Sequence, residues 1–237
     1  MDVMPWANGP SSGLEFAKRT VSELLDSKSL GSDAKGLDVG CAVGRSTFEL
    51  ARYCSTVKGI DFSASFIEAG NKLIGAGELP YRFLEEGDHY KEAIASVSLS
   101  ERQKVEFEVG DACDLASSLG SFDVLHAANL ICRLPDPMLF LNRLPELVKP
   151  GGQLLLATPF TWLAEYTRRE KWLGSGDSME ALKSILSKNF ELEKTSFLSK
   201  SNSIFIEEMY MKYVNNDPAL PESWKKYFNE IGDEKDV

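Results

Sequence analysis

The sequence predicts an α/β fold with a mostly parallel central sheet, and two observations lead to this prediction. Short apolar runs alternate with segments of helical periodicity from residue 15 to residue 186. The chain has 237 residues, of which 43% are hydrophobic and 26% are charged, so it is long enough to bury a core. Strands that alternate with helices favour one layered sheet with right-handed crossovers.

The first third of the chain reads as helix, strand, helix, strand and helix. The first helix has its apolar residues on one face, and both strands are short apolar runs that end at Gly40 and near Asp61. Ser63 has the residue type of an N-cap for the third helix. The predicted ranges are 15–25, 36–40, 46–53, 57–60 and 63–73.

The second half of the domain reads as strand, strand, helix, strand and helix. Pro150-Gly151-Gly152 ends the helix before the last strand, and the last helix has four apolar residues on one face. The predicted ranges are 105–109, 122–127, 137–147, 153–157 and 179–186. Residues 75–104 are highly charged and less regular, so we expect an irregular insert there.

Charge and composition exclude several classes of protein. The chain has 26 basic and 36 acidic residues, and its net charge of −10 argues against a nucleic-acid partner. No apolar run approaches the roughly 20 residues of a membrane span, and the N-terminus lacks the features of a signal peptide. Four cysteines without a C-x-x-C pair indicate a reduced, cytoplasmic chain, and two histidines argue against a metal site.

A glycine-containing turn between the first strand and its helix is the first motif with chemical content. Gly40 and Gly44 leave room for a ligand against the backbone, and the following helix offers free amides to an anionic group. Asp61 follows Gly40 by 21 residues, the usual place for a carboxylate that binds ribose hydroxyls. The alternative is a structural turn, with Asp61 as a helix cap.

The spacing of this turn resembles a known family. Ala42 and the pattern Asp-x-Gly-x-x-x-Gly from Asp38 resemble motif I of class I S-adenosylmethionine-dependent methyltransferases. Three further segments resemble that family in the same order: Gly59–Ser63, Gly110–Ala112 and Pro150–Gly152.

This resemblance implies a Rossmann-like fold, S-adenosylmethionine as cofactor and S-adenosylhomocysteine as product. It also implies a set of cofactor-binding residues at the ends of the strands. They are Asp38, Gly40, Cys41, Ala42, Gly44, Arg45, Ser46, Asp61, Phe62, Ser63, Asp111, Ala112 and Asn129.

From about residue 4 to residue 192, the chain looks like one subfamily, the methyltransferase domain of ovothiol biosynthesis. The segments that carry this likeness are Phe48–Arg52, Gly59–Ala64, Glu85–Gly87, Ala127–Leu134, Thr158–Leu163 and Arg169–Gly174. The resemblance implies a small-molecule substrate, mercaptohistidine, methylated on an imidazole nitrogen. The alternative in the same class is another small metabolite. In that pathway an iron-dependent sulfoxide synthase usually precedes this domain, and the two histidines exclude its iron site.

Candidate substrate residues follow the fourth and fifth predicted strands. Asn129 is placed to bind the cofactor's methionine end or the substrate, or else to cap a turn. Arg133 is placed to pair with a substrate carboxylate, or else to form a surface ion pair. Four aromatic residues could stack on an imidazole or pack as an ordinary lid: Phe160, Trp162, Tyr166 and Trp172. His89 is either a base or a solvated loop residue.

The character of the chain changes at Thr195, so we expect a domain over 1–194 and a helical tail over 195–237. The tail resembles the N-terminal docking segment of the thiamine-dependent component of 2-oxoglutarate dehydrogenase. Residues 204–214 form an amphipathic pattern that suits a protein partner or the chain's own domain. The sheet could therefore lack its last one or two strands. A non-catalytic docking module for a 2-oxoacid dehydrogenase complex is the alternative from another functional class.

Overall fold

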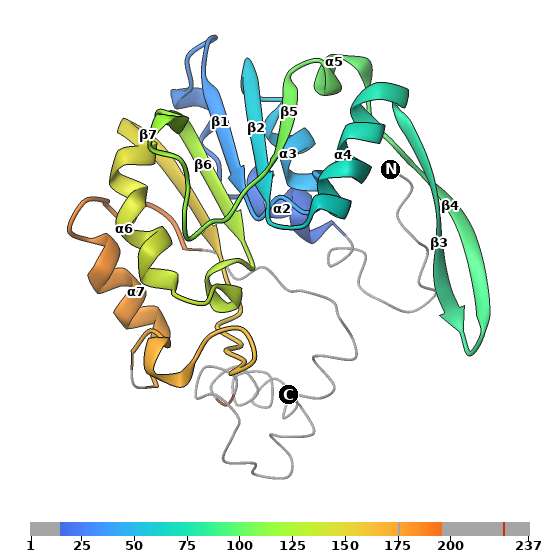
Figure 1. Cartoon of the computed structure of the whole chain (residues 1–237). Helices are drawn as coiled ribbons and strands as arrows, with labels where there is room; N and C mark the ends of the chain where they lie inside the picture. Colours follow the sequence, from blue (N-terminus) through green and yellow to red (C-terminus); the bar gives the residue numbers. More distant parts are fainter. Residues whose placement is uncertain (1–14, 175, 196–224, 226–237) are drawn as a thin grey trace, which may run out of the picture.

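The computed structural model describes residues 15–174, 176–195 and 225, and its centre is a five-stranded parallel sheet (Figure 1). The strand order is β5-β2-β1-β6-β7, and each neighbouring pair is parallel. The strands are β1 (Lys35–Val39), β2 (Thr56–Asp61), β5 (Val105–Val109), β6 (Phe122–Ala128) and β7 (Val148–Ala157). The predicted Rossmann-like α/β fold is thus confirmed.

Helices cover both faces of this sheet (Figure 1). They are α2 (Phe16–Ser22), α3 (Arg45–Leu50), α4 (Ala64–Ala76), α5 (Leu99–Arg102), α6 (Pro137–Leu147) and α7 (Ser178–Leu186). Short 3₁₀ turns lie in the connections between the elements: η1 (Ser27–Ser29), η2 (Ser117–Leu119), η3 (Ile131–Arg133) and η4 (Arg169–Lys171). The Ser63 hydroxyl accepts a hydrogen bond from the Phe66 amide at 3.3 Å, so the predicted N-cap of α4 is confirmed.

The expectation of an irregular insert over 75–104 is wrong. Residues 78–96 form an antiparallel hairpin of β3 (Glu78–Glu86) and β4 (His89–Ser96), which projects beside α4 as a separate two-stranded sheet (Figure 1). Gly87, with φ of 54°, forms its turn. Leu79, Tyr81 and Phe83 alternate along β3, but Lys91 on their face and the apolar Leu84 and Ile94 on the other face interrupt the pattern.

The last strand also differs from its prediction. Pro150-Gly151-Gly152 lies inside β7, which begins at Val148 rather than at residue 153. The pairing with β6 shifts there, from Phe122 opposite Val148 to Val124 opposite Gln153, so the extra residues are absorbed as an irregularity. Within the described residues the sheet ends at β7, and 190–194 form no strand. The predicted helix over 204–214 lies outside the described residues.

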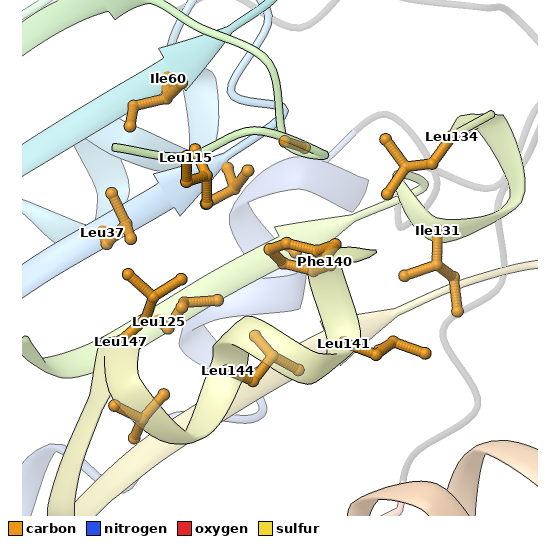
Figure 2. Close-up of a cluster of buried hydrophobic side chains, with 14 of the residues drawn as sticks. Leu37, Ile60, Leu115, Leu125, Ile131, Leu134, Phe140, Leu141, Leu144 and Leu147 are labelled. Atoms are coloured by element: carbon orange, nitrogen blue, oxygen red, sulfur yellow. The ribbon is translucent and has the colours of Figure 1, made fainter. Parts of the chain in front are cut away.

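Two apolar clusters hold the sheet from opposite faces. One packs α6 onto β1 and β6, with Leu37, Leu125 and Phe140 nearly inaccessible to solvent (Figure 2). The other packs α2, α3 and α4 onto the opposite face, with Val21 and Phe48 among its members. Side chains alternate across a strand. Asp38 on β1 and His126 on β6, which neighbour these apolar residues, therefore face α2 and α3.

Candidate active site

Three strained residues mark the edge of the sheet where the parallel strands end. Among the described residues, the non-glycine positions with positive φ are Ala42 (49°), Asn129 (58°) and Phe160 (51°). Each follows the carboxyl end of a strand, namely β1, β6 and β7. Ligands of open α/β sheets bind at this edge, and backbone strain gathers at functional sites. This edge is therefore the candidate active site.

Asp61 joins the ends of three strands at this edge. Its Oδ2 accepts a hydrogen bond from the Ala42 amide at 2.8 Å, and its Oδ1 accepts one from the Ser63 amide at 2.9 Å. Its backbone carbonyl accepts from the Gly110 amide at 3.0 Å. Each carboxylate oxygen has two lone-pair sites, so acceptor capacity remains for a ligand. The predicted carboxylate thus also fixes the turn after β1.

Gly44 has a packing role that its sequence motif does not reveal. It is the N-cap of α3 with φ of 92°, and a Cβ there would lie 2.2 Å from Cζ of Phe107. A Cβ on Gly59 or Gly70 would also come within 3 Å of this ring. Three glycines from separate elements thus surround one aromatic ring on β5. Gly40 has φ of 75°, and a Cβ there would meet the Leu130 side chain at 3.0 Å.

A buried hydrogen-bonded chain lies beneath the turn. Asp38 and His126 are register partners on β1 and β6, both 1% exposed, and Nδ1 of His126 lies 2.7 Å from Oδ1 of Asp38. Nε2 of His126 lies 2.9 Å from the Thr20 hydroxyl, which itself donates to the Ala17 carbonyl. All these bonds form together when both ring nitrogens donate. These hydrogen bonds connect α2 to β1, the strand that leads into the turn.

Several predicted cofactor residues serve this local structure. Ser46 donates to Oδ2 of Asp38 at 2.7 Å, as does Thr47. Cys41 is 3% exposed, and burial raises the pKa of its thiol. The Arg45 side chain instead lies 3.8 Å from the Glu49 carboxylate on the same helix.

The remaining predicted cofactor residues lie on the loops after β2 and β5. Oδ1 of Asp111 accepts from the Cys113 amide at 2.8 Å, and Ala112 is buried. Phe62 is 78% exposed, which leaves an aromatic ring open to solvent beside Asp61.

Asn129 presents an unused acceptor at the end of β6. Its backbone N–H donates to the Ala157 carbonyl at 2.7 Å, which connects the end of β6 to the end of β7. Its Oδ1 is buried and accepts no hydrogen bond from the described residues. An orphaned buried carbonyl is costly unless a ligand or water supplies a donor. The site therefore fits a ligand that carries an N–H or ammonium group.

Arg133 is held by the segment that follows β7. Its Nη1 donates to the carbonyls of Thr161 and Cys132 at 2.6 and 2.9 Å. Its guanidinium lies 5.3 Å from the centre of the Tyr166 ring, at cation–π distance. Arg133 thus binds the 158–174 segment to η3.

The two tryptophans of this segment form a pair. The rings of Trp162 and Trp172 stack with centroids 6.3 Å apart and an interplanar angle of 18°. Their indole N–H groups donate to the Ser178 hydroxyl and the Thr167 carbonyl. Phe160 packs against the cluster under α6. The aromatics after β7 therefore form a fixed wall, of which Tyr166 is the most exposed at 48%.

His89 lies at the exposed start of β4, opposite Glu86 in the hairpin. In the part of the chain that the structure describes, no group of three His, Cys, Asp or Glu side chains could hold a metal ion. No helix in the same part is long and apolar enough to cross a membrane.

Three supporting residues were missed by sequence reasoning: Thr20, Phe107 and His126. A polar residue inside the apolar run of 122–127 was the available signal for His126, because a buried histidine needs partners. Its partner Asp38 depends on the register between β1 and β6, which a sequence pattern does not give. Phe107 gave no signal, since an aromatic residue is ordinary in a strand.

Comparison with known proteins adds family information to this geometry. A family model described as "Methyltransferase domain" matches residues 37–156, which is half of the chain. A second one, described as "2-oxoglutarate dehydrogenase N-terminus", matches residues 195–235.

Similar proteins include the methyltransferase GfsG of Streptomyces halstedii, 27% identical over 144 residues, 60% of this chain and 44% of that protein. A ubiquinone biosynthesis O-methyltransferase of Xanthomonas axonopodis is 26% identical over 153 residues, 64% of this chain and 54% of that protein. The chain spans about half the length of these curated relatives. A TehB-like SAM-dependent methyltransferase structure from Corynebacterium glutamicum has a TM-score of 0.45 and 16% identity, covering 72% of this chain and 71% of that one.

Proposed function

Because this chain belongs to the methyltransferase domain family, we propose that it transfers the methyl group of S-adenosylmethionine to a small molecule. The observation that carries this proposal is the pair of acceptors at the carboxyl edge of the sheet. Asp61 retains lone pairs after bracing the turn, and Oδ1 of Asn129 has no partner among the described residues. A ribose diol and an ammonium group, both present in S-adenosylmethionine, supply donors for such acceptors.

Different residues of this edge contact different parts of the cofactor. Asp61 accepts from the ribose hydroxyls, Asn129 accepts from the methionine ammonium, and the loop of Asp111 and Ala112 lies on the adenine side. When bound, the cofactor supplies a sulfonium methyl that is already electrophilic. The chain's own contribution is then positioning and exclusion of water.

For the acceptor, we propose the imidazole of a thiol-bearing histidine. The support is the resemblance of four segments that flank the site: Gly59–Ala64, Ala127–Leu134, Thr158–Leu163 and Arg169–Gly174. The lone pair of one imidazole nitrogen forms the new N–C bond as the C–S bond breaks, and S-adenosylhomocysteine leaves. The methylated ring then loses the proton of its other nitrogen to water or to a base.

The substrate roles follow from the wall after β7. Phe160 and Tyr166 offer ring faces for the imidazole, and the stacked pair of Trp162 and Trp172 keeps the segment rigid. Arg133 uses Nη1 for backbone carbonyls and Nη2 for the Thr161 hydroxyl at 3.3 Å, which leaves Nε and the second Nη2 hydrogen for a substrate carboxylate.

The test is mass spectrometry of mercaptohistidine incubated with the purified protein and S-adenosylmethionine, with histidine as the control. We expect a gain of one methyl on mercaptohistidine alone. Methylation of neither compound, together with calorimetric binding of S-adenosylmethionine, would reject the substrate and keep the enzyme class. Absence of cofactor binding would reject both.

We propose a second role for residues 195–235, docking to a 2-oxoacid dehydrogenase complex. The specific observation is the family-model match over those residues. The test is co-sedimentation of the full chain with purified 2-oxoglutarate dehydrogenase complex, compared with a chain that ends at Lys194. Equal sedimentation of both chains, or of neither, contradicts docking through this segment.

We further propose that the chain works in a reducing compartment such as the cytoplasm. All four cysteines are free thiols, and three of them are buried. Burial raises the pKa of the Cys54 thiol to about 11, so this thiol stays protonated and unreactive near neutral pH.

A further inference from the structure

A cavity of about 260 Å³ lies beside α3, and Arg45 is the one residue of the expected cofactor-binding set that lines it. Its walls come from α2, α3, α4, the end of β4 and α5. Neither Asp61 nor Asn129 lines it. Its volume is slightly below the range of about 300–1,000 Å³ of sites for drug-sized ligands, so it suits a smaller metabolite.

Charged side chains of both signs line this cavity: Lys18, Arg45, Glu49, Arg52 and Glu101. Lys18 pairs with Glu15 at 3.2 Å, which leaves Arg45 and Arg52 as the cations of the cavity without a partner at hydrogen-bond distance in the described part of the chain. Their guanidinium groups attract an anionic group.

The two arginines have no short partner among the described residues. Arg45 and Arg52 approach Oε2 of Glu49 only to 3.8 and 3.7 Å, which is longer than a hydrogen bond. Arg52 approaches Glu101 only to 3.9 Å. Both guanidinium groups are partly exposed, at 31% and 52%, and keep donors for a ligand.

Glu49 is the second unsatisfied group. Its side chain is 3% exposed, and its carboxylate accepts no hydrogen bond within 3.5 Å from the described residues. Two guanidinium groups compensate the charge of this carboxylate without donating a hydrogen bond to it. A donor inside the cavity would supply the missing bonds.

We propose that this cavity binds a small zwitterionic amino acid with an aliphatic side chain. The ligand carboxylate pairs with Arg45 and Arg52, and its ammonium donates to Glu49. The half-buried Val97 provides apolar surface for the side chain, beside Phe48 and Leu73, which line the same cavity but are only 3% and 2% exposed. A plain anion would leave Glu49 without a donor, and a plain cation would leave both arginines without an acceptor. The proposal stands independently of the methyl acceptor.

The experiment is calorimetric titration of the full chain, without S-adenosylmethionine, with four probes. They are L-leucine, 4-methylpentanoate, which lacks the ammonium, 3-methylbutylamine, which lacks the carboxylate, and inorganic phosphate. We expect leucine to bind at least tenfold more tightly than any other probe. Equal binding of 4-methylpentanoate or phosphate overturns the proposal in favour of a plain anion site. Absence of leucine binding overturns it outright.

Two variants locate the site. Arg52→Gln removes a half-exposed cation and should weaken leucine binding at least tenfold without unfolding the chain. Arg143→Gln is the matched control, because Arg143 pairs with Glu146 on the surface of α6 and should leave binding unchanged. Equal affinities for both variants and the wild type would place the leucine elsewhere and overturn the assignment.

Discussion

At the scale of single residues, Asp61 has two tasks, and one substitution removes both. It braces the turn through Ala42 and Ser63, and it is proposed to accept from ribose hydroxyls. Loss of hydrogen bonds to a charged group costs about 1.5–3 kcal/mol, so Asp61→Ala should raise the dissociation constant for S-adenosylmethionine at least tenfold. Calorimetry measures this, with the exposed Asp114→Ala as control. An unchanged constant would reject the ribose role.

The two histidines give a matched pair for stability. His126→Asn leaves the buried Asp38 and Thr20 with poorly placed partners, and unsatisfied buried groups cost about 1–3 kcal/mol each. The free energy of unfolding in urea should fall by about 2–5 kcal/mol. His89→Asn, on the exposed hairpin, should change it by less than about 0.5 kcal/mol. Similar losses for both variants would contradict a stabilising role of the buried hydrogen bonds of His126.

At the scale of elements, the packing of β5 against the turn after β1 predicts how one added methyl group at Gly44 changes stability. Gly44→Ala adds a Cβ that overlaps Phe107 at a residue with φ of 92°, so it combines overpacking with backbone strain. We expect a loss of about 3 kcal/mol or more in unfolding free energy. Gly87→Ala is the control, because it also has positive φ but meets nothing within 4 Å, and it should cost about 1 kcal/mol.

If the clash with Phe107 dominates, the double variant Gly44→Ala with Phe107→Leu should lose less unfolding free energy than the two single variants lose in sum. A strictly additive double variant would show that the positive φ alone causes the destabilisation.

The start of α6 predicts a pH effect. Asp136 caps this helix and pairs with Lys171 of η4, and the Lys171 bond lowers the pKa of Asp136. The carboxylate therefore stabilises the fold above about pH 4, and this contribution is lost as the pH falls through the lowered pKa. Asp136→Asn can keep the cap and should cost less than about 1 kcal/mol at pH 7. In chemical denaturation the difference from the wild type should vanish near pH 2, and a persistent difference would contradict this origin.

At the scale of the whole molecule, stability should be uneven. The central strands are covered by helices on both faces, whereas β3 and β4 form a two-stranded sheet whose Leu84, Tyr90 and Ile94 are more than half exposed. Isolated two-stranded hairpins are marginal in water. Hydrogen exchange followed by mass spectrometry should show fast exchange for 81–93 and the slowest exchange for β1 and β6. Equal protection of the hairpin would mean that another surface covers it in solution.

The sequence was sufficient for the fold because its strands and helices alternate locally. Ser63 as a cap and the bounds 105–109 and 137–147 were predictable from patterns within a few residues. The hairpin was not, because the alternation of β3 stops after Phe83 and β4 does not continue it. The pairing of Asp38 with His126 was not either, since it depends on register between strands 88 residues apart in the chain.

Because the protein has few histidines, the buried His126 can serve as a spectroscopic reporter of its hydrogen bonds. Only two imidazoles exist in the chain, one beneath the turn after β1 and the other on the hairpin. A nitrogen-15 spectrum of the ring nitrogens should therefore contain two spin systems without any selective labelling. His126 would report on the turn as ligand is added, and His89 would serve as an internal reference from the solvent-exposed arm. Occupancy of the candidate site could thus be followed in the unmodified protein.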